Sequence, residues 1–261
     1  MIMDNAKGRE FIYGINPVYL AVVENAGNRK IYRLYLNRDR KKTDQISWLK
    51  HKCLKENIEI MELDKRGFRN FASKNLGCDY EHTQGIVLEA SAYNYHHLEG
   101  YISKGITPRS YLVMLDGITD VGNFGSVVRN CRAFGADGLI ISKNRSVQVT
   151  GRADKVSAGA LEGVKVIRVT NLVRAIRKLK ESGFWIYGTE TKKGRAEDIC
   201  RVEWAFPLVI IMGSEQKGLS RLVGENCDFF INIGMSSGTD SLNVSVASGI
   251  TMHKIYEEIL K

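Results

Sequence analysis

The chain of 261 residues is long enough for one large domain or two ordinary ones. Its 44% hydrophobic content and three prolines exclude a disordered or low-complexity protein, and no apolar run reaches the roughly 20 residues that a membrane span needs. The net charge of +9 favours a polyanionic partner, nucleic acid before membrane, although a basic surface without such a partner has the same composition.

The cysteines give no sign of a disulfide framework or a metal site. All five lie far apart, without a CxxC pair and without histidines at metal-binding spacing. The first residues also lack the apolar segment of a signal peptide. We therefore expect a soluble, cytoplasmic protein that binds no metal.

Residues 1–91 alternate between helical and extended patterns, which predicts a small α/β unit. Asn16 is expected to cap the first helix, with Pro17 at its first position. Further helices are expected at 44–57 and 68–74, and strands at 31–36, 58–63 and 85–88. Basic residues such as Arg33 and Arg40 suit an RNA-binding surface, but an ordinary solvated face is also charged.

Residues 92–109 lose this periodicity and contain Gly100, Gly105 and Pro108, so a linker is expected there. From Tyr111 onward, strands and helices alternate, which predicts a parallel sheet covered on both faces in a domain of residues 110–261. The last helix, 242–260, is expected to pack on this sheet or to form a dimer interface.

Three loops follow strands of this predicted sheet and carry polar side chains. Parallel sheets bind ligands at the carboxyl ends of their strands, where such loops meet. The first loop leads to Asn123 and Arg129, which are six residues apart and are expected to share a helix face. The second carries Glu215. The third leads to Ser241, a candidate helix cap, and Asn243.

These residue types narrow the chemistry. The first loop matches neither the phosphate-binding P-loop nor the dinucleotide fingerprint, which disfavours nucleotide hydrolysis and dinucleotide binding. The set also contains no nucleophile with an adjacent base and no metal ligands. A purely hydrogen-bonding set favours the positioning of a reactant that arrives already activated.

The three blocks together resemble motifs one, two and three of the SpoU/TrmH RNA ribose 2′-O-methyltransferases. They read Asn123-Phe-Gly-Ser-Val-Val-Arg129-Asn, Ile211-Met-Gly-Ser-Glu215-Gln-Lys-Gly218 and Ile233-Gly-Met-Ser…Ser241-Leu-Asn243-Val-Ser. Tyr13-Gly-Ile-Asn16-Pro-Val and His82-Thr-Gln84-Gly85-Ile are similar to the substrate-binding domain of the larger members. The likeness covers nearly the whole chain and is closest to bacterial enzymes that modify a guanosine of 23S ribosomal RNA.

The resemblance implies a parallel-sheet trefoil-knot (SPOUT) methyltransferase domain at 110–261, preceded by a ribosomal-protein-like RNA-binding domain at 1–91. It implies S-adenosyl-L-methionine as the methyl donor and ribosomal RNA as the partner. It also implies a homodimer with active sites at the subunit interface.

Particular residues follow from the same resemblance. The implied catalytic or substrate-orienting residues are Asn123, Arg129, Glu215, Ser241 and Asn243. The implied cofactor-binding residues are Thr189, Glu190, Gly213, Ser214, Ile233, Met235 and Leu242. RNA is expected to contact Asn16, Arg33 and Arg40. One position departs from the family: Gly234 stands where proline usually follows the strand isoleucine, so a less rigid loop is expected there.

Three alternatives remain open at this point. One is a tRNA 2′-O-methyltransferase of the same family. Another is a non-catalytic ribosomal-RNA-binding assembly protein, and the third is a nucleotide-binding enzyme of another kind. Methyl incorporation into RNA separates them.

Overall fold

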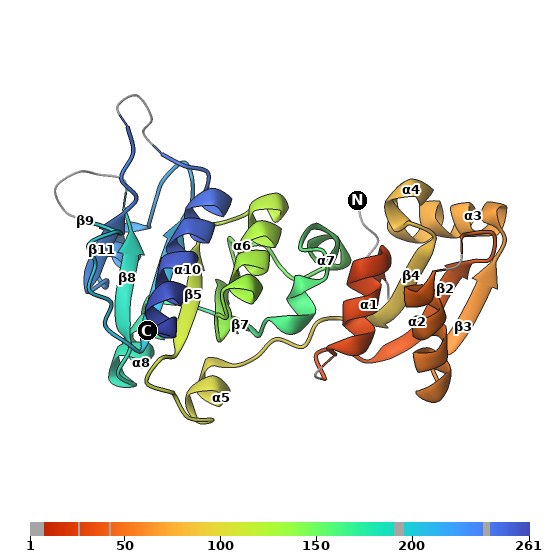
Figure 1. Ribbon diagram of the computed structural model, residues 1–261, viewed down its shortest axis with the longest axis horizontal. Coiled ribbons are helices and arrows are strands. Elements are labelled where there is room, and N and C mark those ends of the chain that lie inside the picture. Colours follow the sequence, from red (N-terminus) through yellow and green to blue (C-terminus); the bar gives the residue numbers. More distant parts are fainter. Residues whose placement is uncertain (1–7, 26, 42, 191–195, 237–240) are drawn as a thin grey trace. The chain divides into compact units, whose positions relative to one another are not determined.

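The computed structural model describes residues 8–25, 27–41, 43–190, 196–236 and 241–261, shown in Figure 1. The described chain forms two compact units. The first comprises residues up to Asn94 together with Val149–Gly163, and the second comprises Tyr95–Gln148 and Val164–Lys261.

The first unit is a four-stranded sheet between helices. Its strand order is β1 (Arg9–Tyr13), β4 (Ile86–Ser91), β2 (Ile31–Asn37) and β3 (Glu59–Leu63), with only the β2–β3 pair parallel. Its helices are α1 (Ile15–Val23), α2 (Asp44–Lys55), α3 (Lys65–Leu76) and α4 (Tyr80–Thr83). Because side chains alternate along β2, Leu34 and Leu36 pack in the core with α1 and α2, while Tyr35 stacks on Phe71 of α3.

The start of α1 differs from the predicted one. The helix begins at Ile15, so Asn16 and Pro17 lie in its first turn and Asn16 is not the cap. Gly14 precedes the helix with φ 96°, a conformation that side-chain-bearing residues rarely adopt. The backbone N–H of Ile15 is instead satisfied by Gln84 Oε1 at 2.9 Å. A partner 69 residues away thus replaces the local cap.

Residues 149–163 form α7 (Gly151–Val156) and a 3₁₀ turn, η1 (Ala160–Gly163), and they group with the first unit rather than with the expected 110–261 domain. The reason is close packing, because a Cβ atom added to Gly151 would lie 1.8 Å from the carbonyl oxygen of Phe11. The expected linker also differs. Its residues from Tyr95 onward belong to the second unit, where they include α5 (Leu98–Ile102).

A buried ion cluster also holds α7 and η1 in the first unit. The guanidinium of Arg29 donates to Glu10 (2.7 Å), Asp154 (2.8 Å) and Glu162 (3.0 Å). Asp154 Oδ1 and Glu162 Oε2 are buried and have no partner among the described residues. Burial raises the pKa of Asp154 well above its ordinary value, against the opposing charge of Arg29, and burial likewise raises the pKa of Glu162.

This cluster predicts a pH-dependent stability. A carboxyl whose pKa is higher in the folded state than in the unfolded state contributes fully to stability when the pH is below its unfolded-state pKa. This contribution is lost as the pH rises through the folded-state pKa. Thermal unfolding of the full chain should therefore show a midpoint that falls as the pH rises above the ordinary carboxyl range. Asp154→Asn keeps an acceptor for Arg29 but cannot ionise, so it should flatten this dependence. The exposed Asp79→Asn is the control, and equal pH slopes in the two variants would contradict the assignment.

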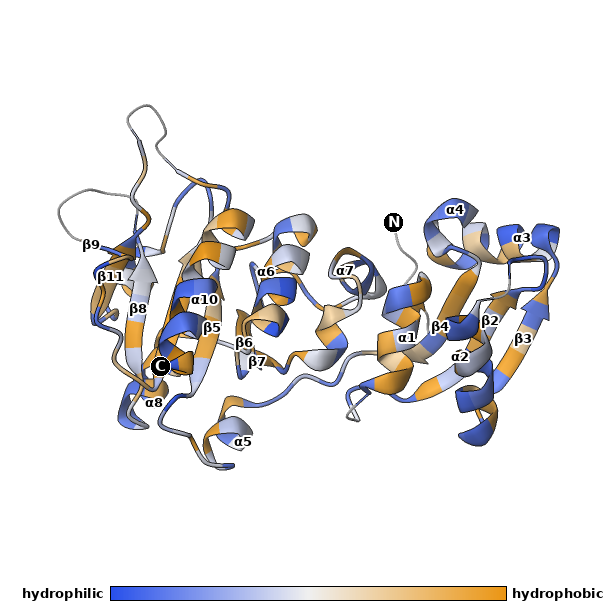
Figure 2. Cartoon of the chain, in the orientation of Figure 1, coloured by the Kyte–Doolittle hydropathy of each residue, from blue (hydrophilic) through white to orange (hydrophobic). Residues whose placement is uncertain are grey.

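The second unit is built on a seven-stranded, fully parallel sheet, which confirms the predicted fold class. Its strands, in spatial order, are β7 (Val166–Val169), β6 (Gly138–Ser142), β5 (Tyr111–Asp116), β10 (Leu208–Gly213), β8 (Trp185–Thr189), β11 (Phe229–Asn232) and β9 (Glu197–Asp198). Figure 2 shows hydrophobic residues along the strands of both sheets and hydrophilic residues on helices such as α3. Nearly continuous apolar strands are typical of a sheet covered on both faces.

The helices of the second unit cover both faces of its sheet. They are α5, α6 (Val121–Ala133), α8 (Leu172–Glu181), α9 (Arg221–Gly224) and α10 (Val244–Leu260). Residues of α5, α8 and α9 share one core with Leu112 and Met114 of β5, while α6 and α10 lie against each other (Figure 1). No helix in the described part of the chain is long and apolar enough to span a membrane.

Candidate active site

The site begins where β5 and β10 end side by side, since Asp116 is the register partner of Gly213. The turn after β10 folds back tightly, with Ser214 and Gly218 exchanging backbone hydrogen bonds of 3.1 and 2.8 Å. Gly213 has no room for a side chain, because an added Cβ would lie 2.3 Å from the carbonyl carbon of Gly218. The turn therefore presents Glu215 from a closely packed base.

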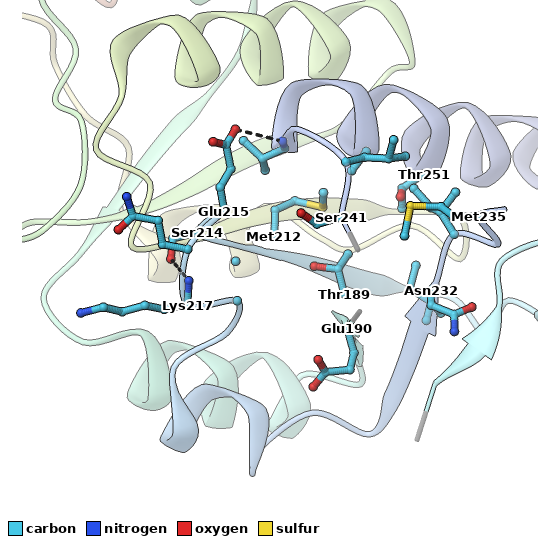
Figure 3. A pocket seen from close by; sticks show the side chains of 18 residues that line it. Thr189, Glu190, Met212, Ser214, Glu215, Lys217, Asn232, Met235, Ser241 and Thr251 are labelled. Carbon is cyan, nitrogen blue, oxygen red and sulfur yellow. Dashed lines mark hydrogen bonds between the residues drawn. The ribbon is translucent and has the colours of Figure 1, made fainter. Parts of the chain in front are cut away.

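Glu215 gathers side chains from the other two loops. Asn123 Nδ2 donates to Glu215 Oε1 at 3.0 Å, and Asn243 Nδ2 donates both to that oxygen and to Asn123 Oδ1, the latter at 3.1 Å. The N–H of Val244 also points at Glu215 Oε1, at 3.4 Å, and this bond is drawn in Figure 3. Glu215 and Asn243 are exposed and Asn123 is half-buried, so this polar cluster faces a solvent-accessible space.

Two helix starts position these side chains, and one differs from the prediction. Asp120 caps α6 by accepting from the N–H of Asn123 at 2.7 Å, so the Asn123 side chain remains available to Glu215. Asn243, not Ser241, caps α10, because its Oδ1 accepts from the N–H of Ser245 at 2.9 Å. Ser241 is exposed and precedes the helix.

Arg129 is not part of the polar cluster in this chain, and the predicted shared face with Asn123 is wrong. Six residues of α-helix at about 100° each place the two side chains about 120° apart. Arg129 is exposed and forms no hydrogen bond or ion pair with any residue that the structure describes. It nevertheless lies beside α10, since the next residue, Asn130, donates to Ser245 O (3.0 Å) and Ser248 Oγ (2.8 Å).

A cavity of about 340 Å³ opens next to the polar cluster, at the ends of β8, β10 and β11 and the start of α10. Its lining includes every residue expected to bind the cofactor: Thr189, Glu190, Gly213, Ser214, Ile233, Met235 and Leu242. We call it the donor cavity. Glu215 and Ser241 also line it, whereas Asn123 and Asn243 do not.

No sequence motif pointed directly to other lining residues, such as Met212 and Thr251 (Figure 3). Val244, Ala247 and Thr251 recur at helical spacing along α10, which is the pattern that would have found them. Thr251 is fully buried, and its Oγ1 has no partner among the described residues.

These features fit S-adenosylmethionine. The volume lies in the range of small-molecule sites. Apolar side chains such as Met212 and Leu242 suit the adenine ring and the methionine chain. The unpaired Thr251 hydroxyl and the Glu190 carboxylate offer hydrogen bonds to the polar groups of such a ligand.

The structure also explains why glycine stands at position 234. A Cβ atom at this position would lie 2.7 Å from Asp198 Oδ2 of β9. The other carboxylate oxygen of Asp198 accepts from the N–H of Cys200 at 2.9 Å, which fixes the side chain. The chain after β11 therefore passes too close to β9 for a larger residue to fit without displacing Asp198.

The SpoU rRNA Methylase family matches residues 110–253, more than half of the chain. The putative TrmH family tRNA/rRNA methyltransferase YacO of Bacillus subtilis (strain 168) is 33% identical over 252 residues, which cover 95% of this chain and 96% of the relative. A putative TrmH family tRNA/rRNA methyltransferase of Staphylococcus saprophyticus is 40% identical over 177 residues, which cover 67% of this chain and 70% of the relative.

Solved structures agree with this fold. The SpoU methyltransferase AviRb from Streptomyces viridochromogenes in complex with AdoMet has a TM-score of 0.78 at 18% identity, covering 100% of this chain and 95% of its own. An AdoMet-bound rRNA methyltransferase from Sinorhizobium meliloti has a TM-score of 0.77 at 20% identity, covering 97% and 89%. The chain belongs to the SpoU/TrmH family of RNA methyltransferases. Its methyl donor is S-adenosylmethionine.

Proposed function

We propose that this RNA 2′-O-ribose methyltransferase modifies a guanosine of large-subunit ribosomal RNA in the cytoplasm, acting as a homodimer. The observation that carries the proposal is the Glu215-centred cluster, which joins all three sequence motifs at the edge of the donor cavity. The motif resemblance to the 23S ribosomal RNA enzymes supports the choice of substrate. The names of the relatives cover both tRNA and rRNA, so tRNA is the second candidate.

When bound, S-adenosylmethionine supplies an electrophilic methyl group. The protein must then hold a ribose 2′-hydroxyl in line with that methyl and favour the loss of its proton. We assign the holding of the ribose to Glu215, whose position Asn123 and Asn243 fix. Ser241, on the wall of the donor cavity, lies where it can contact the bound donor.

Arg129 is assigned to the developing negative charge. A guanidinium stays protonated in ordinary sites, so it stabilises an alkoxide or binds the adjacent phosphate rather than acting as a base. Arg129 does not line the donor cavity of its own chain and does not belong to the polar cluster there. This position favours a role for Arg129 in the active site of a second chain. Val246 (51% exposed) and Ile250 (37% exposed) lie one turn apart on α10, beside α6, and offer an apolar surface for such a pairing.

Arg33 and Arg40, two residues of the first unit that are expected to bind RNA, differ in whether a carboxylate neutralises their charge. Arg33 pairs with Glu59 at 2.5 Å and donates to Tyr35 Oη at 3.2 Å. Arg40 is half-buried, with Nε and Nη1 buried without a partner among the described residues, and no described carboxylate pairs with its guanidinium. Asn16 is exposed on α1. We therefore assign RNA contact to Arg40 and Asn16 before Arg33.

This difference gives a matched pair of variants. Arg40→Ala should weaken RNA binding and reduce the slope of log Kobs against log salt by about 0.7–0.9, the value for one lost phosphate contact. Arg33→Ala should change the slope much less, because Glu59 already neutralises its charge. Filter binding across a KCl series measures both, and equal slopes for the two variants would argue against the assignment.

The substrate is tested by incubating the enzyme with radiolabelled S-adenosylmethionine and total RNA from cells that lack it. Methylation of a 2′-oxygen leaves the neighbouring phosphodiester resistant to alkali, so the labelled nucleotide survives in a dinucleotide. Label in a guanosine of large-subunit RNA supports the proposal. Label in tRNA supports the second candidate, and absence of label would favour a non-catalytic assembly protein.

A further inference from the structure

A second cavity of about 540 Å³ lies on the other side of the Glu215 cluster. We call it the acceptor cavity; its lining includes Asp116, Thr119, Asn144, Arg145, Glu215 and Lys217. Both cavities are lined by Val244 and by the turn of residues 214–218, which includes Glu215 and Lys217. Asn123 lines only the acceptor cavity and Ser241 only the donor cavity. The turn that carries Glu215 is therefore the wall that the two cavities share.

We propose that the acceptor cavity binds the target nucleotide of the RNA, with Arg145 and Lys217 contacting its phosphates. The proposal rests on the proposed function, because methyl transfer needs an acceptor site directly beside the donor site. Bound S-adenosylmethionine would supply the methyl group from the donor cavity, and Glu215 at the shared wall would orient the ribose 2′-hydroxyl toward it.

The acceptor cavity is lined by three carboxylates, those of Asp116, Asp120 and Glu215, and by the cations of Arg145 and Lys217. Its carboxylates already accept backbone hydrogen bonds, Asp116 from Ser220 N at 2.6 Å and Asp120 from Asn123 N at 2.7 Å. The side chains of Arg145 and Lys217 form no hydrogen bond or ion pair within the described part of the chain. Arg145 and Lys217 are therefore the charged side chains of the lining that have no described partner, and such cations suit the phosphates on either side of a nucleotide.

The loop that carries Arg145 is held in a strained shape. Arg145 has φ 57°, a left-handed conformation that is uncommon for residues other than glycine. The side-chain amide of Gln148 donates to three carbonyl oxygens of this loop, the shortest bond being 3.1 Å to Ser146. The N–H of Val147 donates to Ile118 O at 3.1 Å and so ties the loop to the one after β5. Strain that surrounding bonds maintain is common at ligand sites.

The acceptor cavity is also large enough for its proposed ligand. Its volume lies within the usual range for small-molecule sites, into which a single nucleotide falls. Unlike the donor cavity, it lacks a methionine-rich apolar wall, so it suits a charged ligand better than S-adenosylmethionine. The donor cavity therefore suits S-adenosylmethionine, and the acceptor cavity suits the charged nucleotide.

The test removes each cation without disturbing the loop. Arg145→Asn suits the left-handed backbone, Arg145→Lys keeps the charge, and Lys217→Ala removes the second cation. Lys143→Ala is the control, because Lys143 is exposed two residues away and does not line the cavity. The probe is protein-free large-subunit ribosomal RNA from cells lacking the enzyme, bound in a KCl series with S-adenosylhomocysteine present.

Arg145→Asn and Lys217→Ala should each reduce the salt slope by about 0.7, the value per phosphate contact on single strands. Each should raise the KM for RNA about tenfold, as loss of a charged contact does. Arg145 lies outside the donor cavity, so Arg145→Asn should leave donor affinity within about twofold. Arg145→Lys and Lys143→Ala should retain the parent slope. An unchanged slope and KM in the Arg145→Asn/Lys217→Ala double variant would overturn the proposal. Wild-type protein that labels no RNA would instead refute the proposed function, and the slopes would still test the acceptor cavity.

Discussion

Arg129→Ala is expected to lower the rate of methyl transfer by about 10²–10³-fold, the usual cost of removing one group that stabilises developing charge. Donor affinity should stay within about twofold of the parent, because Arg129 does not line the donor cavity of its own chain. Single-turnover methylation with saturating RNA measures the rate, and isothermal titration with S-adenosylhomocysteine measures the affinity.

Arg132→Ala is the control for this variant, since Arg132 lies on the same helix and is also exposed. It should retain most of the activity. Loss of donor binding in Arg129→Ala, or equal loss of activity in both variants, would mean that Arg129 serves the structure rather than the reaction.

Gly213→Ala is expected to have the second large effect, this time on donor binding. The added methyl would lie 2.3 Å from a backbone carbon of Gly218, so the turn that carries Ser214 and Glu215 must move. Both residues line the donor cavity, and Glu215 anchors the polar cluster. Displacing a closely packed turn costs about 1–3 kcal/mol, which corresponds to a loss of donor affinity of about 5- to 150-fold.

Gly224→Ala supplies the matched control, because the nearest atom to its added Cβ lies 4.0 Å away. Circular dichroism of both variants checks that the fold is retained. A Gly213→Ala protein with parental donor affinity would show that the turn does not depend on this close approach.

The sequence predicted the parallel sheet and the three loops well, because both depend on local patterns. Apolar runs such as Leu208–Met212 are typical of strands in a sheet that is covered on both faces. Two of the motif blocks contain Glu215 and Asn243, and the structure joins these side chains by a hydrogen bond. Neither observation required knowledge of distant contacts.

Distant contacts account for the differences. Gln84 satisfies the start of α1 from 69 residues away, so the local capping pattern at Asn16 was misleading. Residues 149–163 group with the first unit through Gly151 and Asp154, whose partners Phe11 and Arg29 are more than 100 residues distant. The strand β1 was missed for the same reason, since it is short and depends on antiparallel pairing with β4.

The position of Arg129 shows a different limit. The number of residues between two positions on a helix determines the angle between their side chains around the helix axis. For Asn123 and Arg129 that angle points the two side chains to different sides of α6 within a single chain. A motif therefore identifies residues that act together without stating whether they come from the same copy of the protein.

Mixing two inactive variants tests the central claim most directly. Arg129→Ala and Glu215→Ala chains are unfolded together, refolded as mixed dimers and assayed for methyl transfer to RNA. If Arg129 of one chain completes the Glu215 cluster of the other, each mixed dimer contains one intact site, and activity should recover to about a quarter of the wild-type value for random pairing. Mixed dimers that form but remain as inactive as the separate variants would contradict this account.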